Sequence, residues 1–308
     1  MLLCDKYLTP VSLDEAFNLI EENRGRCRLI AGATDLLPWA REGRAGDVHI
    51  PVLIDIARIP ELRERSVSDT RVRLGAATPI QRFLDDAALG RVMPAMPRCA
   101  IWFADDQLRE SATIGGNIVN ASPAADCIPP LVAHDAILEL ASRRRVSGSI
   151  EKRRVPLADF IAGPGKTALA EDEILIAIEC AALSGYGGSF EKVGHRRSLV
   201  ISTVCLAAMV RLDPSGRAFE DVRICIGGIG PVPDRLRDVE QFLMDGPLTA
   251  SRLEQAAEMP VSRVRSRSRQ DYRRDVVRGF MMRGLFNAAR RAGAGPDILS
   301  PELEAACA

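Results

Sequence analysis

Two glycine-containing segments are the parts of the chain best suited to chemistry through the backbone. They are "LIAGATDLLP" at residues 29–38 and "TIGGN" at residues 113–117. Glycine lets a backbone N–H approach a ligand with no Cβ in the way. Several N–H groups in one turn form a nest for an anion, typically a pyrophosphate, and Thr34 or Thr113 would add a neutral hydroxyl donor. Two such nests, from separate parts of the chain, could hold one long anionic ligand between them.

The better-known phosphate-binding motifs are missing. "GPGKTAL" at residues 163–169 superficially resembles a Walker loop, but Phe160 stands where the first glycine of that motif would fall. No G-x-G-x-x-G occurs, and "GGIG" at residues 227–230 does not match it. The sequence therefore favours neither a kinase-like nor a doubly wound dinucleotide-binding fold. A glycine pair alone is also compatible with an ordinary tight turn.

Metal and nucleophile chemistry have little support. The three histidines are not spaced as ligands, and the eight cysteines include no C-x-x-C pair. A disulfide framework, a zinc site and an iron–sulfur site are therefore not expected, because each needs paired or clustered thiols. Most cysteines are interpreted as small buried hydrophobic residues.

Composition is that of an ordinary globular protein. The chain has 308 residues, 47% hydrophobic and 27% charged, and its 41 basic residues balance 41 acidic ones. The length suggests about two domains at ~150 residues each. The zero net charge argues against general nucleic-acid binding. We expect a cytoplasmic protein without membrane insertion, because the sequence shows neither a signal-peptide pattern nor an apolar run of ~20 residues.

Local patterns divide the chain. A capping box at Ser12 and Glu15 predicts a helix that ends near residues 23–25. A strand running into a glycine turn is expected at 26–32, and further strands at 52–56 and 71–78. Strand and helix patterns alternate in the first part, which predicts a small βαβ lobe at about 1–58 and a mixed lobe at 59–180. Glycine and serine accumulate at 181–189, where we place a domain boundary.

The last third has a different pattern. Two strands around a "DPSG" turn at residues 213–216 precede three helical patterns, and the last helix carries an apolar stripe interpreted as core: Val276, Val277, Phe280, Met281 and Leu285. The basic run at residues 262–274 is interpreted as a solvated face or a partner contact rather than a phosphate site. We expect a C-terminal domain at 181–294 and a flexible tail at 295–308.

Together the two glycine segments resemble the FAD-binding medium subunit of the molybdenum hydroxylases, the family of the xanthine, carbon monoxide and nicotinate dehydrogenases. The resemblance covers roughly residues 3–292. It implies an α+β fold: a two-lobed FAD-binding domain of the vanillyl-alcohol oxidase / p-cresol methylhydroxylase type, followed by a C-terminal antiparallel sheet-and-helix domain.

The resemblance also implies a cofactor site. The first loop would wrap the pyrophosphate through Ile30, Ala31, Gly32, Ala33, Thr34, Asp35 and Leu36. The second would meet the phosphates and ribitol through Thr113, Gly115, Gly116 and Asn117. Phe103 would pack on the flavin ring, Asp126 would bind a ribose or the ribityl chain, and Ile174 and Leu175 would lie beside the ring. Lys192, in a K-x-x-x-R-R pattern, would approach its polar edge.

Three residues depart from the family pattern. Ala33 replaces a glycine that is frequent in the first loop, Glu110 replaces an asparagine before the second, and Val200 replaces an aspartate. These departures concern the polar tuning of the flavin pocket more than binding itself. The cysteine-rich insertion of the benzoyl-CoA reductase type is missing from the sequence.

The implied function is electron transfer by an oxidoreductase subunit. Electrons would come from a large molybdopterin subunit through two [2Fe–2S] clusters of a small subunit to FAD on this chain, and then to NAD, a quinone or dioxygen. A dimer of heterotrimers is the expected assembly, and this chain would hold neither a metal nor a catalytic side chain. Two alternatives remain open: a free-standing FAD-dependent oxidase of an alcohol or sugar, and a flavin-free scaffold.

Overall fold

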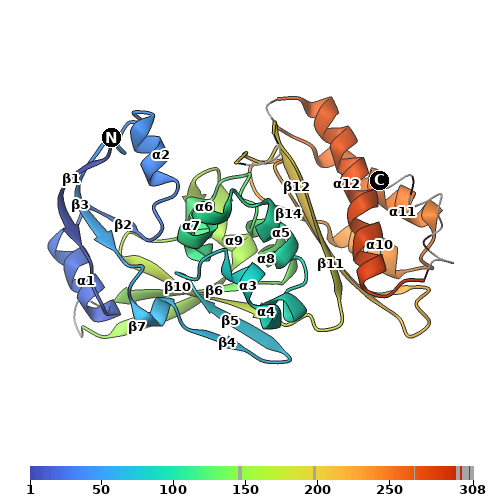
Figure 1. The fold of residues 1–308 in the computed structure, drawn as a ribbon, viewed down its shortest axis with the longest axis horizontal. Coiled ribbons are helices and arrows are strands. Elements are labelled where there is room, and N and C mark those ends of the chain that lie inside the picture. The colour runs from blue at the N-terminus through green and yellow to red at the C-terminus, as the bar shows by residue number, and fades with distance from the viewer. Residues whose placement is uncertain (145–147, 197–198, 267, 296–298, 300–304, 306–308) are drawn as a thin grey trace.

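The computed structural model describes residues 1–144, 148–196, 199–266, 268–295, 299 and 305. Two lobes and a C-terminal unit follow one another along the long axis of the molecule (Figure 1). Most of the tail predicted to be flexible, residues 295–308, lies outside the described residues. None of the described helices combines the length and apolar character that crossing a membrane requires.

The first lobe is a small parallel sheet flanked by two helices. Its strand order is β1-β3-β2, and its elements are β1 (Leu3–Leu8), α1 (Leu13–Glu22), β2 (Cys27–Ile30), α2 (Leu36–Arg41) and β3 (His49–Asp55). Ser12 caps α1 by accepting from the Glu15 amide at 3.2 Å, and the Glu15 carboxylate accepts from the Val11 amide at 2.8 Å. The helix predicted from the S-x-x-E pattern is therefore confirmed.

The second lobe is built on an antiparallel sheet of order β4-β5-β10-β6-β7, with short helices beside it (Figure 1). Its strands are β4 (Arg65–Val67), β5 (Arg71–Gly75), β6 (Ile137–Arg143), β7 (Ile150–Pro156) and β10 (Glu173–Ala181), with a separate pair β8 (Ile161–Gly163) and β9 (Lys166–Thr167). Its helices are η1 (Pro60–Leu62), α3 (Arg82–Asp85), α4 (Ala87–Val92), α5 (Met96–Trp102), α6 (Asp106–Ser111), α7 (Ile114–Asn120), α8 (Ile128–Ala133) and α9 (Leu157–Phe160).

The C-terminal unit is an antiparallel sheet of order β11-β12-β13-β14 covered by helices. Its strands are β11 (Gly187–Val193), β12 (Val204–Leu212), β13 (Phe219–Gly227) and β14 (Asp234–Arg235). Its helices are α10 (Arg237–Met244), α11 (Ala250–Glu258), η2 (Met259–Arg263) and α12 (Gln270–Arg291). The apolar stripe predicted on α12 packs into this core, because Val277, Phe280, Met281 and Leu285 are buried there.

Strand β12 has two buried faces, and this joins the C-terminal unit to the second lobe. Successive side chains of a strand point to opposite faces. Val204, Leu206, Ala208 and Val210 pack with α12, whereas Cys205, Ala207 and Met209 pack with the core of the second lobe. Among the cysteines that the structure describes, five, including Cys205, are buried, which confirms the interpretation of most cysteines as small hydrophobic residues.

A buried ion pair crosses the same junction. Lys192 on β11 donates to Asp126 Oδ2 at 2.6 Å and to the carbonyl oxygen of Trp102 at 3.1 Å, and its side chain is 2% exposed. Ser202 donates to the other oxygen of Asp126. Burial raises the pKa of Asp126, and the charge of Lys192 opposes that rise. The pair therefore ties β11 to the end of α5, one residue before Phe103.

We expect Lys192→Met to destabilise the fold by about 3–5 kcal/mol, because it leaves a buried carboxylate without its cation. The double variant Lys192→Met/Asp126→Asn should lose less than the single variant, since no buried charge remains. Urea unfolding of both variants measures the difference.

The matched control is Lys152→Met. Lys152 pairs with Glu139 at 2.9 Å, but its side chain is 52% exposed. An exposed pair of this kind contributes about 0–1 kcal/mol. Equal losses in the Lys192 and Lys152 variants would contradict the assigned role of the buried pair.

Candidate functional site

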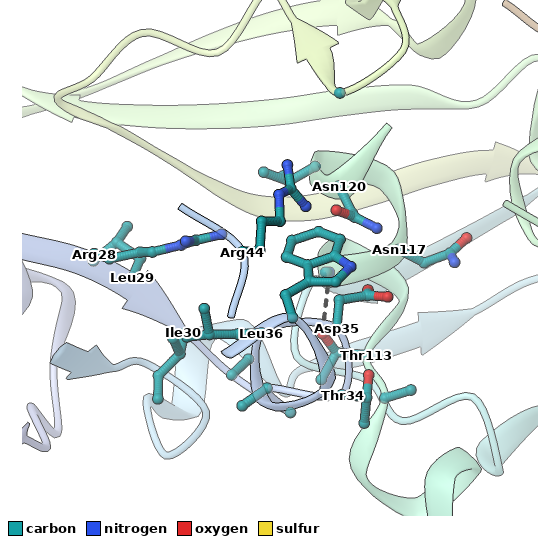
Figure 2. A pocket seen from close by; sticks show the side chains of 18 of the residues that line it. Arg28, Leu29, Ile30, Thr34, Asp35, Leu36, Arg44, Thr113, Asn117 and Asn120 are labelled. Carbon is teal, nitrogen blue, oxygen red and sulfur yellow. Dashed lines mark hydrogen bonds between the residues drawn. The ribbon is translucent and has the colours of Figure 1, made fainter. Parts of the chain in front are cut away.

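The two glycine loops come together at one cavity between the two lobes. The cavity has a volume of about 320 Å³, and residues 28–36, Trp39 and Arg44 line it from the first lobe. From the second lobe it is lined by Phe103, Ala112, Thr113, Gly116, Asn117, Val119, Asn120 and Gly165. Figure 2 shows the labelled side chains of both loops around this space. The expectation that the loops face one another is therefore met by the geometry.

The first loop leaves its backbone donors open. β2 ends at Ile30, whose carbonyl accepts from the Ile56 amide at 2.9 Å, and α2 begins at Leu36. Within the described part of the chain, no hydrogen bond engages the amides of residues 32–36. These residues line the cavity, and of the five only Leu36 is buried, so their amides are open to the cavity and give the loop the donor capacity that an anion requires.

The second loop uses its amides internally. The amides of Ile114 and Gly115 donate to the carbonyls of Thr78 and Ala76 at 2.9 and 2.8 Å. Those of Gly116 and Asn117 donate to the Thr113 hydroxyl and carbonyl oxygens at 3.1 and 3.0 Å. The prediction of a second backbone nest is therefore wrong. Thr113 is the N-cap residue of α7, and these amides already donate to Thr113 and to the carbonyls that follow β5.

What the second loop offers instead is side chains. Asn117 lines the cavity, and its Oδ1 is buried without a hydrogen-bond partner among the described residues. A buried acceptor without a partner is costly, so such an atom points to a missing donor. The Thr113 hydroxyl also lines the cavity and keeps its own proton to donate.

Two glycines are needed for packing rather than for ligand contact. A Cβ on Gly32 would overlap the carbonyl oxygen of Ser111, and one on Gly115 would lie 2.6 Å from the Cβ of Ala76. At Gly116 a Cβ would meet only the Thr113 hydroxyl, at 2.9 Å. Gly32 therefore lets the backbones of the two lobes touch, which the sequence pattern did not reveal.

A second, apolar cavity of about 130 Å³ adjoins the first. It shares Ile30, Ala31, Thr113 and Gly116 with the larger cavity, and adds Gly115, Ile174 and Leu175. Its other walls include Ile56, Leu62 and Leu169. Phe103 lines the larger cavity only, so the structure places it and the β10 residues in different parts of the site.

Arg109 supports Phe103 from behind. Its guanidinium is buried and donates to the Phe103 carbonyl at 2.9 Å and to Gln81 at 3.0 Å. Glu110, one of the departures from the family pattern, is exposed. Glu110 therefore directly follows Arg109, the residue that holds the Phe103 carbonyl.

Cations gather in the larger cavity, and sequence reasoning missed them. Arg28 and Arg44 both pair with the buried Asp47, and Arg44 stacks 4.1 Å from the ring centroid of Trp39. Asp35 is the acid of the first loop, and burial raises its pKa. No local pattern predicts this cluster, because Asp47 lies 19 residues from Arg28.

Asp126 and Lys192 line neither cavity. Both carboxylate oxygens of Asp126 are engaged, one by Lys192 and one by Ser202. The two residues that were expected to touch the ribose and the ring edge therefore form the ion pair behind Trp102. Arg197 of the K-x-x-x-R-R pattern lies outside the described residues.

Ala33 adopts a backbone conformation that suits glycine. Its φ is +52°, in the left-handed region that costs a residue with a Cβ roughly 1–2 kcal/mol. We expect Ala33→Gly to raise the free energy of unfolding by about 0.5–1 kcal/mol, because relief of that cost exceeds the added entropy of the unfolded chain. Thermal or urea unfolding measures the change.

Ala31→Gly is the control, since Ala31 has no positive φ. It should lower the free energy of unfolding by about 0.5–1 kcal/mol. Destabilisation by both substitutions would show that the conformation of Ala33 carries no strain.

Comparison with known proteins gives two family matches. Residues 3–180 match the family described as "FAD binding domain in molybdopterin dehydrogenase". Residues 189–288 match the "CO dehydrogenase flavoprotein C-terminal domain". Together these matches span both lobes and most of the C-terminal unit.

Individual relatives agree with these matches along nearly the whole chain. The xanthine dehydrogenase FAD-binding subunit of Escherichia coli O157:H7 is 32% identical over 93% of this chain and 97% of its own. The glyceraldehyde dehydrogenase medium chain of Sulfolobus acidocaldarius is 30% identical over 92% and 98%.

Among solved structures, a chain of the carbon monoxide dehydrogenase of Hydrogenophaga pseudoflava superposes with a TM-score of 0.85. It is 26% identical, and the match covers 94% of this chain and 99% of that one. The open first loop, the two adjoining cavities and these matches have one explanation: the chain belongs to the FAD-binding subunits of the molybdopterin dehydrogenases, a family of oxidoreductases.

Proposed function

We propose that this chain holds FAD between its two lobes, with the pyrophosphate on the first loop. The observation that carries the proposal is the run of unengaged amides at residues 32–36. These residues line the same cavity as Asn117, whose buried Oδ1 has no hydrogen-bond partner among the described residues. Thr34 adds a hydroxyl, and Asp35 and Leu36 close the turn into α2. Arg28 and Arg44 supply positive charge for the phosphates.

The flavin ring would take the apolar side of the site. Ile174 and Leu175 of β10 form one wall of the smaller cavity, together with Ile30 and Ala31. Thr113, Gly115 and Gly116 would lie along the ribitol between the two cavities. Phe103, from the same lobe as β10, would approach the ring from the larger cavity, with its carbonyl held by Arg109.

Asp126 and Lys192 would act through position rather than contact. Lys192 donates to the carbonyl oxygen of Trp102, so the ion pair fixes the position of the backbone immediately before Phe103. Val200, which stands where many relatives have an aspartate, packs its side chain against Gly194. We infer that the pair and its surroundings tune the environment of the ring.

The chain would then serve as the electron-transfer subunit of a molybdenum hydroxylase. FAD, once bound, would supply two-electron and one-electron chemistry, while the protein orients and shields it. By family resemblance, a large molybdopterin subunit and a small [2Fe–2S] subunit would deliver the electrons, in a dimer of heterotrimers in the cytoplasm. An external NAD, quinone or dioxygen would accept them.

The domain division belongs to the same proposal. Residues 1–180, with lobes at 1–58 and 59–180, would be the FAD-binding domain, and residues 181–294 the C-terminal domain. The basic helical segment around Arg263 would help to dock partner subunits, although in this chain Arg263 also pairs with Asp234 and Asp238.

The visible absorption spectrum of the natively purified complex tests the function. A flavin band overlaid with iron–sulfur absorption, with molybdenum in the same fraction, is the expected result. A flavin band without iron or molybdenum in any fraction would favour a free-standing oxidase. A folded, colourless chain that takes up no added FAD would overturn the flavin assignment.

Asn117→Leu separates ligand binding from folding. The substitution removes a buried acceptor that has no protein partner, so we expect the ligand-free chain to unfold with equal or higher free energy. The dissociation constant for FAD should rise about ten-fold, the equivalent of one lost hydrogen bond. Fluorescence titration with FAD and urea unfolding measure the two effects.

Asn18→Leu is the control, because Asn18 is exposed on α1 and lines neither cavity. It should leave FAD affinity unchanged. An Asn117→Leu variant that binds FAD as tightly as the natural chain would remove Asn117 from the site.

A further inference from the structure

A separate cavity of about 400 Å³ lies between α5, β11 and α12. Trp102 lines this cavity, whereas the next residue, Phe103, lines the larger cavity between the lobes. The residues that carry the argument are Arg98, Trp102, Glu191, Arg283, Asn287 and Arg291, and we call this site the cationic pocket. None of them lines either cavity of the proposed FAD site.

The acid in the cationic pocket is already neutralised. Glu191 accepts from Arg283 at 2.7 Å and from the Asn287 amide at 3.2 Å, one bond to each carboxylate oxygen. Lys192, which also lines the pocket, is paired with Asp126. The charges of Glu191, Arg283 and Lys192 are therefore satisfied without any ligand.

Two exposed arginines of the pocket, Arg98 and Arg291, have no acidic partner of their own among the residues that the structure describes. In the described part of the chain the side chain of Arg98 makes no hydrogen bond or ion pair, and the guanidinium of Arg291 donates only to the carbonyl of Gly188, at 2.9 Å. The pKa of Arg291 is lowered first by burial and then by the positive charge of Arg98. The charge of Glu191 offsets part of this repulsion. Glu191 is already bound by Arg283 and Asn287, so the positive charges of Arg98 and Arg291 still leave the pocket complementary to an anion.

Local placement, not composition, produces this charge. The chain has equal numbers of basic and acidic residues, so its net charge of zero supplies no general attraction for anions. Arg98 comes from α5 and Arg291 from the last turn of α12, and the fold brings them to one pocket. A pair of guanidinium forks matches phosphate oxygens in geometry as well as in charge.

The wall beside the guanidinium groups is apolar and partly exposed. Ile101 is 54% exposed and Trp102 39% exposed, and both line the pocket. An indole ring at the mouth of a site is a platform for stacking a flat base. Phosphate recognition and a stacking surface therefore occur side by side.

We propose that the cationic pocket binds a nucleotide, with its phosphate on Arg98 and Arg291 and its base on Trp102. The ligand would contact Trp102, and the next residue, Phe103, lines the larger cavity. This site is distinct from the proposed FAD site, and its existence does not depend on flavin binding.

Calorimetric titration of the full chain, with added FAD present, tests the proposal, and the probes are AMP and inorganic phosphate. We expect saturable AMP binding, weakened about ten-fold by Arg98→Ala or by Arg291→Ala. Trp102→Ala should weaken AMP binding and leave phosphate binding unchanged. Arg98→Ala is the cleaner variant, because Arg98 supports no other described group.

The control is Arg28→Ala, which removes a cation from the cavity between the lobes. It should leave AMP binding at the cationic pocket unchanged. If the chain takes up no FAD, the same titrations still assign any AMP binding, because one site responds to Arg98 and the other to Arg28.

Three results would overturn the proposal. The first is no saturable AMP binding up to about 10 mM, an affinity too weak to matter. The second is AMP binding that responds to Arg28→Ala and not to Arg98→Ala. The third is AMP binding by the isolated chain that disappears in the assembled complex, which would make the pocket a partner contact.

Discussion

The contact between Gly32 and Ser111 is the constraint on which the candidate site depends. At this point the backbone of the first lobe lies directly against the backbone of the second, and even one methyl group would overlap the Ser111 carbonyl. Because protein interiors are packed as tightly as crystals, such a contact fixes the distance between the lobes. The cavity, the open amides beside Gly32 and the position of Thr113 all follow from that distance.

The two loops then divide the work. In the first loop the amides of residues 32–36 make no hydrogen bond among the described residues. In the second loop the amides donate within the N-cap of α7 and to the carbonyls that follow β5. The second loop is therefore a wall with its amides already paired, which carries Asn117, and the first is the proposed binding surface. The C-terminal sheet supports the second lobe. Strand β12 packs into both cores, and Lys192 donates to the last residue of α5.

Patterns within one element were predictable, and contacts between distant elements were not. The capping box at Ser12 predicted helix α1, and the apolar stripe predicted the buried face of α12. Both depend on residues within a few positions of each other. The pairing of Lys192 with Asp126 spans 66 residues, so no local pattern encodes it. The sequence singled out the glycines at 32 and 115 because glycine lets the backbone approach a ligand. The residues that they pack against become known only from the fold.

Hydrogen exchange with and without FAD tests the central claim most directly. The amides of residues 32–36 should exchange quickly in the FAD-free chain and become protected when FAD binds. The amides of residues 114–117 should be protected in both states, since they are already hydrogen-bonded. A first loop that exchanges equally fast with FAD bound would show that its backbone does not hold the pyrophosphate.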